Sequence, residues 1–174
     1  MAIVKANYTR QGRAAKASAR YTQNRPGKDG ARVVRTLFKA DGKVEREEVY
    51  TMIDQAAKGS YFFRFVISPD PKSEDRDKDL SLRELTEKTL ASLEARFRQP
   101  LQWVATIHAD HAEHRHIHAI VIMPERLNKQ DFQLLRGAAT EEALEQRRQL
   151  DLAREQRERS QAQREGLGLE VSSW

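Results

Sequence analysis

Residues 101–123 read LQWVATIHADHAEHRHIHAIVIM, and this stretch decides the fold. It contains two apolar runs, 101–108 and 115–123, with the length and the β-branched content of strands. A short polar segment joins them, which is the arrangement of a β-hairpin. We therefore expect two neighbouring antiparallel strands here, within a larger sheet.

The rest of the chain supplies strands and helices around this hairpin. Residues 2–8 and 61–68 have the composition of strands, and the second, YFFRFVIS, is apolar almost throughout, which indicates burial on both faces. The spacing of small and apolar residues predicts helices over 11–23, 45–57 and 81–98. A long, largely polar helix is expected from residue 131 onward. The expected fold class is α+β: a central antiparallel sheet with helices mainly on one face, a metal site on the other, and a long C-terminal helix.

Composition excludes several classes of protein. The 174 residues, of which 39% are hydrophobic, suffice for one domain with a core. The absence of cysteine excludes disulfides, thiolate metal sites and a cysteine nucleophile. No apolar run approaches the roughly 18 residues of a membrane span, and the first residues lack the apolar core of a secretory signal. We expect a cytoplasmic protein without a membrane partner, divided into a domain at 1–127 and a helical extension at 128–174.

Positive charge is concentrated at the N-terminal end. The formal net charge is +5, but residues 1–39 contain ten Lys or Arg and one acid, a net of +9, so the other 135 residues carry −4. Within the expected helix 11–23, Arg13, Lys16 and Arg20 recur at helical spacing and form one basic stripe. Such a segment favours a polyanionic partner, although a solvated basic face has the same composition.

All five histidines lie between residues 108 and 118, in HADHAEHRHIH. His116 and His118 share one face of the second strand, where both imidazoles can converge on one ion, and Ile117 takes the other face. His114 shares that face but lies about 14 Å from His118 on a straight strand. The third ligand should therefore come from the neighbouring strand, where His108 is suitably placed. The pattern predicts a metal site formed by His108, His116 and His118.

Other interpretations of the histidines stay open. The hairpin could be a histidine-rich surface segment that binds no metal. It could also be a structural zinc site, with a fourth ligand from Asp110 or Glu113. His111 and His114 are expected in the loop near the mouth of the site. Imidazole ligands taken alone suit Mn²⁺, Zn²⁺ or Ni²⁺ better than Mg²⁺.

The histidines and a tyrosine near the N-terminus resemble a known family. His108-x-Asp110, a short loop and His116-Ile117-His118 resemble the HUH endonucleases, and above all the mobilization relaxases, which nick plasmid DNA at a transfer origin. In that family a tyrosine on an N-terminal helix precedes the histidines, and Tyr21, before a basic turn, has this setting. The resemblance covers roughly residues 1–125 and implies a relaxase-like sheet with an RRM-like core.

The resemblance also implies a reaction. Tyr21 would attack phosphorus, form a 5′-phosphotyrosine link and release a 3′-hydroxyl, a nicking step that is reversible. Mg²⁺ or Mn²⁺ would be the ion in use, with Zn²⁺ or Ni²⁺ possible in a purified sample. Asp110 would orient a histidine ligand or help to deprotonate Tyr21, unless it is a plain loop acid. Tyr8 is the alternative nucleophile.

Single-stranded DNA at a transfer origin is the expected partner, together with relaxosome accessory proteins. The contacts should be mostly electrostatic and salt-sensitive. The candidate DNA-binding residues are Arg13, Lys16, Arg20, Arg25 and Arg115, with Lys5, Arg10 and Lys28 as further basic contacts. Two alternatives to an enzyme remain: a non-catalytic single-stranded DNA-binding module with a structural metal site, and a metal-binding protein whose C-terminal helix recruits a partner.

Overall fold

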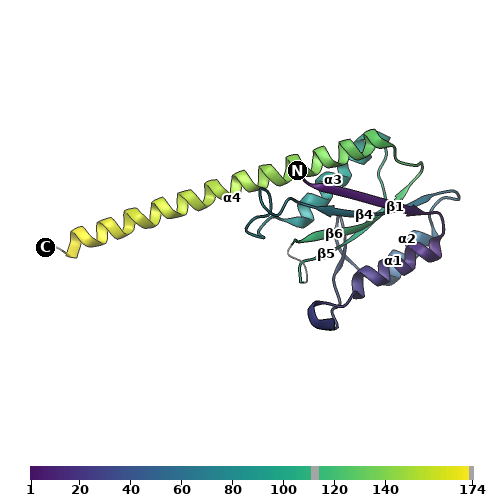
Figure 1. Cartoon of the computed structure of the whole chain (residues 1–174), viewed down its shortest axis with the longest axis horizontal. Helices are drawn as coiled ribbons and strands as arrows, with labels where there is room; N and C mark the ends of the chain where they lie inside the picture. The colour runs from purple at the N-terminus through teal and green to yellow at the C-terminus, as the bar shows by residue number, and fades with distance from the viewer. Residues whose placement is uncertain (111–113, 173–174) are drawn as a thin grey trace.

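A computed structural model describes residues 1–110 and 114–172, which form a sheet with helices on both sides (Figure 1). The strands are β1 (Ile3–Thr9), β2 (Leu37–Lys39), β3 (Gly42–Val44), β4 (Tyr61–Ser68), β5 (Trp103–His108) and β6 (His116–Met123). The α-helices are α1 (Gly12–Asn24), α2 (Arg46–Asp54), α3 (Leu82–Phe97) and α4 (Lys129–Ser172), with a short 3-10 helix, η1, at Lys28–Gly30. The expected fold class, α+β with a central antiparallel sheet and a long C-terminal helix, is confirmed.

The strands lie in the order β1-β4-β6-β5-β2-β3, and each neighbouring pair is antiparallel. The four expected strands occupy the first four places in this order, and the small β2–β3 hairpin extends the sheet beyond them. In the β5–β6 hairpin, His108 lies opposite His116 and Thr106 lies opposite His118. On the other side of β6, Val66 of β4 also lies opposite His118. The sheet register therefore places the three histidines on one face.

The helices cover both faces of the sheet, rather than mainly one. Helix α3 and the first part of α4 pack on the face that carries Phe63, whereas α1 and α2 pack on the face that carries Phe62 (Figure 1). The physical reason is the alternation of side chains along a strand, which sends consecutive phenylalanines of β4 to opposite faces. Each face then exposes apolar surface that a helix must cover. The histidines consequently share their face with α1 and do not lie on a helix-free face.

Helix α4 changes character along its length. Leu135, Ala139 and Ala143 are completely buried in the cluster formed with α3 and the sheet. From Arg154 to Gly168 the side chains are exposed, and the helix projects away from the sheet (Figure 1). The expected extension at 128–174 therefore begins with a segment that belongs to the core of the domain.

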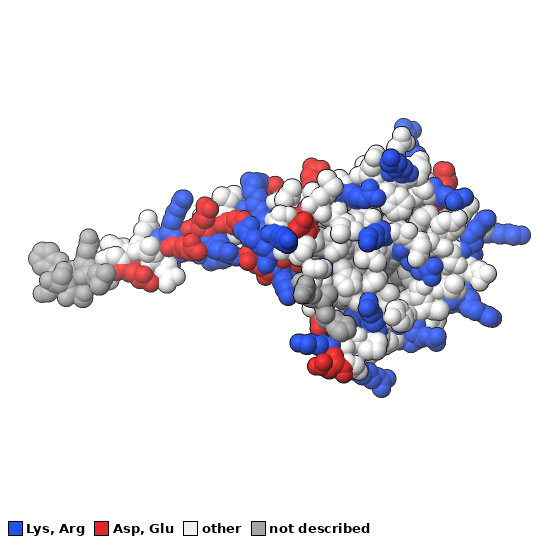
Figure 2. All heavy atoms as spheres, viewed as in Figure 1, with Lys and Arg blue, Asp and Glu red and all other residues white. Residues whose placement is uncertain are grey.

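Basic side chains predominate over the body of the domain, whereas acidic and basic side chains are mixed along α4 (Figure 2). Figure 2 shows Lys and Arg over the body of the domain, while Asp and Glu gather mainly along α4 and beside it. Several of these acids pair with arginines, as Asp79 does with Arg147 at 2.7 Å and Asp77 does with Arg154 at 2.9 Å. None of the helices formed by the described residues has the length and the apolar character needed to cross a bilayer.

Candidate metal centre and adjoining groove

His108, His116 and His118 come together at one end of the β5–β6 hairpin. One ring nitrogen from each histidine lies within 4.8 Å of the corresponding nitrogens of the other two. The ring centroids of His108 and His118 are 4.4 Å apart, and those of His108 and His116 are 5.2 Å apart. Three imidazole nitrogens within this span are suited to a single divalent ion, which imidazole binds at about 2.0–2.2 Å.

The hydrogen bonds of the three rings leave a nitrogen of each available to a metal. His108 Nε2 donates to the carbonyl oxygen of Thr22 at 3.0 Å, which leaves Nδ1 as an acceptor. His116 Nδ1 lies 3.3 Å from the carbonyl oxygen of His114, which leaves Nε2. His118 Nε2 is buried and has no partner among the described residues. A buried unpartnered nitrogen costs stability, so the donor set fits a bound cation.

Burial keeps these imidazoles neutral. It lowers the pKa of His108 to about 3 and the pKa of His118 to about 4, and the neighbouring histidines add to both shifts. The pKa of His116 is also lowered, first by burial and then by the positive charges of Arg25 and Arg35. Only a deprotonated nitrogen binds a metal ion. The rings therefore offer their lone pairs throughout the neutral pH range.

Asp110, expected near the metal, pairs with an arginine and lies close enough to His108 and His116 to interact electrostatically with both. Arg35 Nη2 donates to both carboxylate oxygens of Asp110, at 3.0 and 3.2 Å. Among the described residues Asp110 is not part of the metal cluster, and it makes no hydrogen bond to a histidine or to Tyr21. The structure thus gives no described carboxylate as a fourth ligand. His111 and Glu113 lie outside the described residues.

Arg35 was not expected to contribute, and it joins helix α1 to the hairpin. Its side chain is buried, and besides Asp110 it donates to the carbonyl oxygens of Arg25 at 2.7 Å and Thr22 at 3.4 Å. The backbone N–H of Arg35 donates to the carbonyl oxygen of Gln23 at 2.9 Å. The last carbonyls of a helix lack intrahelical partners, and these bonds satisfy them. The only sequence signal was an arginine within the apolar run RVVRTLF.

Tyr21 lies on α1 beside the histidines. Its side chain is 63% exposed. Together with Ser18 of α1, Arg64 of β4 and His118 of β6, it lines a groove of about 560 Å³ between the helix and the sheet. The structure therefore brings the expected nucleophile and an expected metal ligand to one surface.

Tyr8, the alternative nucleophile, faces the other side of the sheet. It lies opposite Phe63, whose side chain belongs to the cluster under α3 and α4. The two rings are 5.3 Å apart. Directly opposite residues of antiparallel strands share a face, so Tyr8 and the histidines lie on different faces. Tyr21 is the better placed of the two tyrosines.

The basic stripe of α1 lies next to the groove. Arg13, Lys16 and Arg20 border a shallow hollow with Tyr50. Lys16 pairs with Asp54 at 2.6 Å, while Arg13 and Arg20 are exposed. The stripe is therefore a candidate polyanion surface in which two of the three cations face solvent.

Arg25 and Arg115 have different surroundings. Arg25 follows the end of α1, near enough to lower the pKa of His116 and His118. Arg115 donates to both carboxylate oxygens of Asp75, at 2.7 and 2.8 Å, and ties the hairpin to the 69–80 loop. This placement supports a structural role for Arg115 and gives no support to the expected contact with phosphate.

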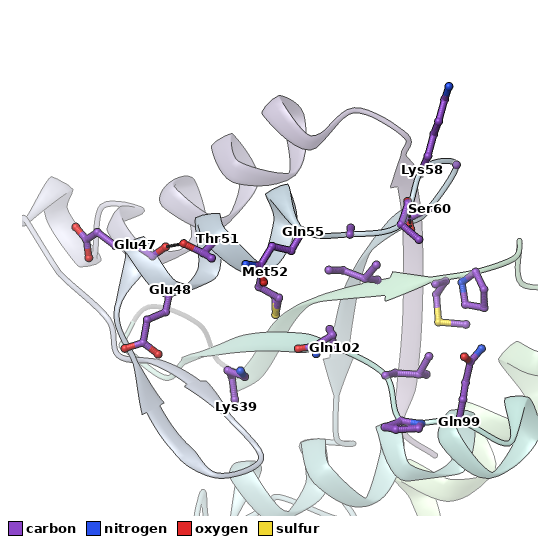
Figure 3. Close-up of a pocket in the computed structure, with 18 residues that line it drawn as sticks. Lys39, Glu47, Glu48, Thr51, Met52, Gln55, Lys58, Ser60, Gln99 and Gln102 are labelled. Carbon is purple, nitrogen blue, oxygen red and sulfur yellow. Dashed lines mark hydrogen bonds between the residues drawn. The ribbon is translucent and has the colours of Figure 1, made fainter.

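A larger hollow, of about 800 Å³, lies at the opposite end of β6 (Figure 3). Glu48 and Met52 of α2 line it together with Gln102 and Met123. Figure 3 shows Lys58 directed away from its centre. None of its described residues belongs to a metal-ligating cluster. The candidate metal ligands therefore lie at the other end of β6, away from this hollow.

Comparisons with known proteins do not identify a family for this chain. The chain matches no protein-family model, no curated protein and no solved structure at a significant level. The fold and the site define an α+β protein with an antiparallel sheet and a candidate three-histidine metal centre. The resemblance to the mobilization relaxases rests on the sequence motifs alone.

Proposed function

We propose that this protein is a metal-dependent DNA-nicking transesterase, which cuts and rejoins one strand through a covalent tyrosine. The observation that carries the proposal is the convergence of two groups on one surface. Three neutral histidines each offer a ring nitrogen within 4.8 Å of the other two, and the exposed Tyr21 lines the groove that reaches His118. A metal ion and an oxygen nucleophile are the two parts that such a reaction needs.

The three histidines would hold a divalent cation, with Mg²⁺ or Mn²⁺ in use and Zn²⁺ or Ni²⁺ accepted in purified samples. The cation would polarise a phosphoryl oxygen, and neutral ligands leave it its full charge. The Tyr21 oxygen forms a bond to phosphorus while the bond from phosphorus to the 3′ oxygen breaks. The proton lost by the phenol is balanced by the proton gained at the 3′-hydroxyl. One phosphodiester replaces another, so a 3′-hydroxyl can reverse the step.

Basic residues lie around the proposed site. Arg20 precedes Tyr21 on α1, and Arg25 lies near enough to the histidines to lower the pKa of His118. The proposed substrate is single-stranded DNA at a transfer origin, the proposed partners are relaxosome accessory proteins, and the proposed location is the cytoplasm.

Covalent trapping tests the proposal. Wild-type protein is incubated with Mn²⁺ and a pool of randomised single-stranded oligonucleotides that carry a label at the 3′ end. On a denaturing gel, label should migrate with wild-type protein and with the control Tyr8→Phe, but not with Tyr21→Phe or His116→Ala. A band that survives Tyr21→Phe would exclude Tyr21 as the nucleophile. No band with Mg²⁺, Mn²⁺, Zn²⁺ or Ni²⁺ would overturn the proposal.

A non-catalytic single-stranded DNA-binding module with a structural metal site is the second candidate. The pairing of Asp110 with Arg35 favours it, because Tyr21 then has no hydrogen-bonded base among the described residues. This alternative predicts salt-sensitive DNA binding that Tyr21→Phe leaves unchanged, with no covalent product.

A further inference from the structure

Arg64 interrupts an otherwise apolar strand. It is the one charged residue in YFFRFVIS, and β4 is paired on both sides, with β1 and with β6. Arg64 lies opposite Asn7 of β1 and Ile120 of β6. Because Ile120 is two residues from His118 on the same strand, Arg64 lies on the histidine face. An arginine at such a position loses part of its hydration, so its charge requires compensation.

The partners of Arg64 are neutral. Its Nε donates to Asn7 Oδ1 at 2.7 Å, and Nη1 donates to Ser18 Oγ at 3.2 Å. Among the described side chains of residues 1–110 and 114–168, no acidic group forms an ion pair with it. Other poorly exposed arginines do pair with aspartates, as the bridges of Arg35, Arg115 and Arg147 show. Arg64 is therefore a partly buried cation whose described partners leave its charge uncompensated.

The position of Arg64 relates this charge to the candidate reaction. It lines the same groove as Tyr21 and His118. Arg64 lies on the strand next to that of His118, opposite Ile120. Ile120 is two residues from His118, which corresponds to about 7 Å along the strand. Asn7 and Ser18 hold Nε and Nη1, and Nη2 has no described acceptor. The guanidinium is thus fixed with a free donor in the groove.

We propose that Arg64 binds a backbone phosphate of single-stranded DNA, next to the phosphate that Tyr21 attacks. This inference rests on the proposed function and specifies how the substrate lies in the site. A guanidinium and a phosphate form a strong charge-assisted hydrogen bond. The groove, with a volume of about 560 Å³, gives the strand a path between α1 and the sheet. Arg64 binds and orients the substrate and takes no part in proton transfer.

Equilibrium binding tests the role of Arg64 without the covalent step. A fluorescein-labelled (dT)20 strand is titrated in a Tyr21→Phe background, and anisotropy is followed at several salt concentrations. Arg64→Met, which keeps the aliphatic stem, should weaken binding about tenfold at low salt. It should also reduce the slope of log affinity against log salt by about 0.7, the share of one phosphate contact on a single strand. Arg64→Lys should recover part of the affinity.

The matched control is Arg83→Met, an equal change in net charge on α3, which covers the opposite face of the sheet. It should change the affinity less than about twofold and leave the salt slope unaltered. Equal effects of Arg64→Met and Arg83→Met would overturn the assignment, whatever the covalent assay shows. An Arg64-dependent affinity without any covalent product would instead reject the proposed reaction and keep the phosphate contact. Failure of the parent protein to bind the strand at low salt would reject both.

A second variant tests the role of Arg64 without replacing it, in case Arg64→Met does not fold. Asn7 is exposed on the edge strand β1, and its substitution leaves the core unchanged. Asn7→Ala removes the acceptor that orients Arg64 Nε, and it should weaken the binding of (dT)20 about threefold. The melting temperature and the metal affinity should stay at the parent values. An unchanged affinity for the strand would contradict a role for this fixed guanidinium.

Discussion

On β6, Ile117 and Ala119 face α3 and α4, while His116 and His118 face α1. Ile117 is completely buried in an apolar cluster, yet the next residue has a buried ring nitrogen without a described partner. Helix α3 has six buried residues, packed between α4 and the sheet, whereas α1 has only Ala15 and Ala19. Both faces contribute apolar core, but the face that carries the histidines also leaves polar groups and a groove available to a ligand. Substitutions of neighbouring β6 residues that point to opposite faces should therefore affect different properties.

The largest loss of stability is expected from a substitution on the face of the sheet that α3 and α4 cover. Ile117→Ala should lower the free energy of unfolding by about 3–4 kcal/mol, because the side chain is fully buried and its removal leaves a cavity. Urea unfolding followed by circular dichroism measures this loss. A loss below about 1 kcal/mol would show that the surrounding side chains close the cavity. The two faces would then not differ in their contribution to stability.

A substitution at the next residue, His118, should change metal affinity rather than stability. His118→Ala should lower the affinity for Mn²⁺ or Zn²⁺ at least about 100-fold, because it removes one of three ligands. The metal-free protein should be as stable as wild type or more stable, because a buried unpartnered nitrogen is lost. Isothermal titration calorimetry and thermal melting give the two values. A large loss of stability with unchanged metal affinity would assign His118 to the core.

The histidine face should also make the metal-free protein sensitive to acid. The pKa of His108 is about 3 in the folded state and near 6.5 when exposed, so only the unfolded chain takes up a proton between these values. Stability is therefore present above pH 6.5 and is lost as the pH falls, by about 2 kcal/mol between pH 7 and pH 5 for His108 alone. Unfolding with denaturant at each pH, in the presence of a chelator, measures the slope. In His108→Gln the slope should be shallower, and an identical slope would contradict burial of a neutral ring.

Much of this contrast between faces could be predicted from the sequence. The apolar runs of β4, β5 and β6 mark the central strands, and the alternation in His116-Ile117-His118 separates ligands from core. The helices were expected mainly on one face, although YFFRFVIS is apolar on both sides and so requires cover on both. The sequence of this strand alone was enough to predict helices on both faces of the sheet.

The ion pairs could not be predicted in this way. Arg35 and Asp110 are 75 residues apart in the chain, and Arg115 and Asp75 are 40 apart. No periodicity links such positions, because each pair depends on how loops pack once the sheet has formed. Asp110 and Arg115 were chosen as site residues because they lie next to histidines in the sequence, and the sequence carries no signal for the arginine and the aspartate that pair with them. Strand alternation predicts which residues share a face, whereas the partners of loop residues depend on the tertiary structure.

The smallest effect on stability is expected from a truncation within the exposed end of α4. The side chains of Leu135, Ala139 and Ala143 are buried, and Arg147 anchors the helix to Asp79. From residue 157 to 168 the side chains are exposed. A chain that stops after Gln156 should therefore lose less than about 0.5 kcal/mol of unfolding free energy and keep its metal affinity. A chain that stops before Leu135 loses that buried surface and should not fold. If removal of residues after Gln156 lowered the free energy of unfolding by several kcal/mol, the projecting segment would have to pack on another surface, such as a second copy of the chain. The unfolding of the full chain would then depend on protein concentration.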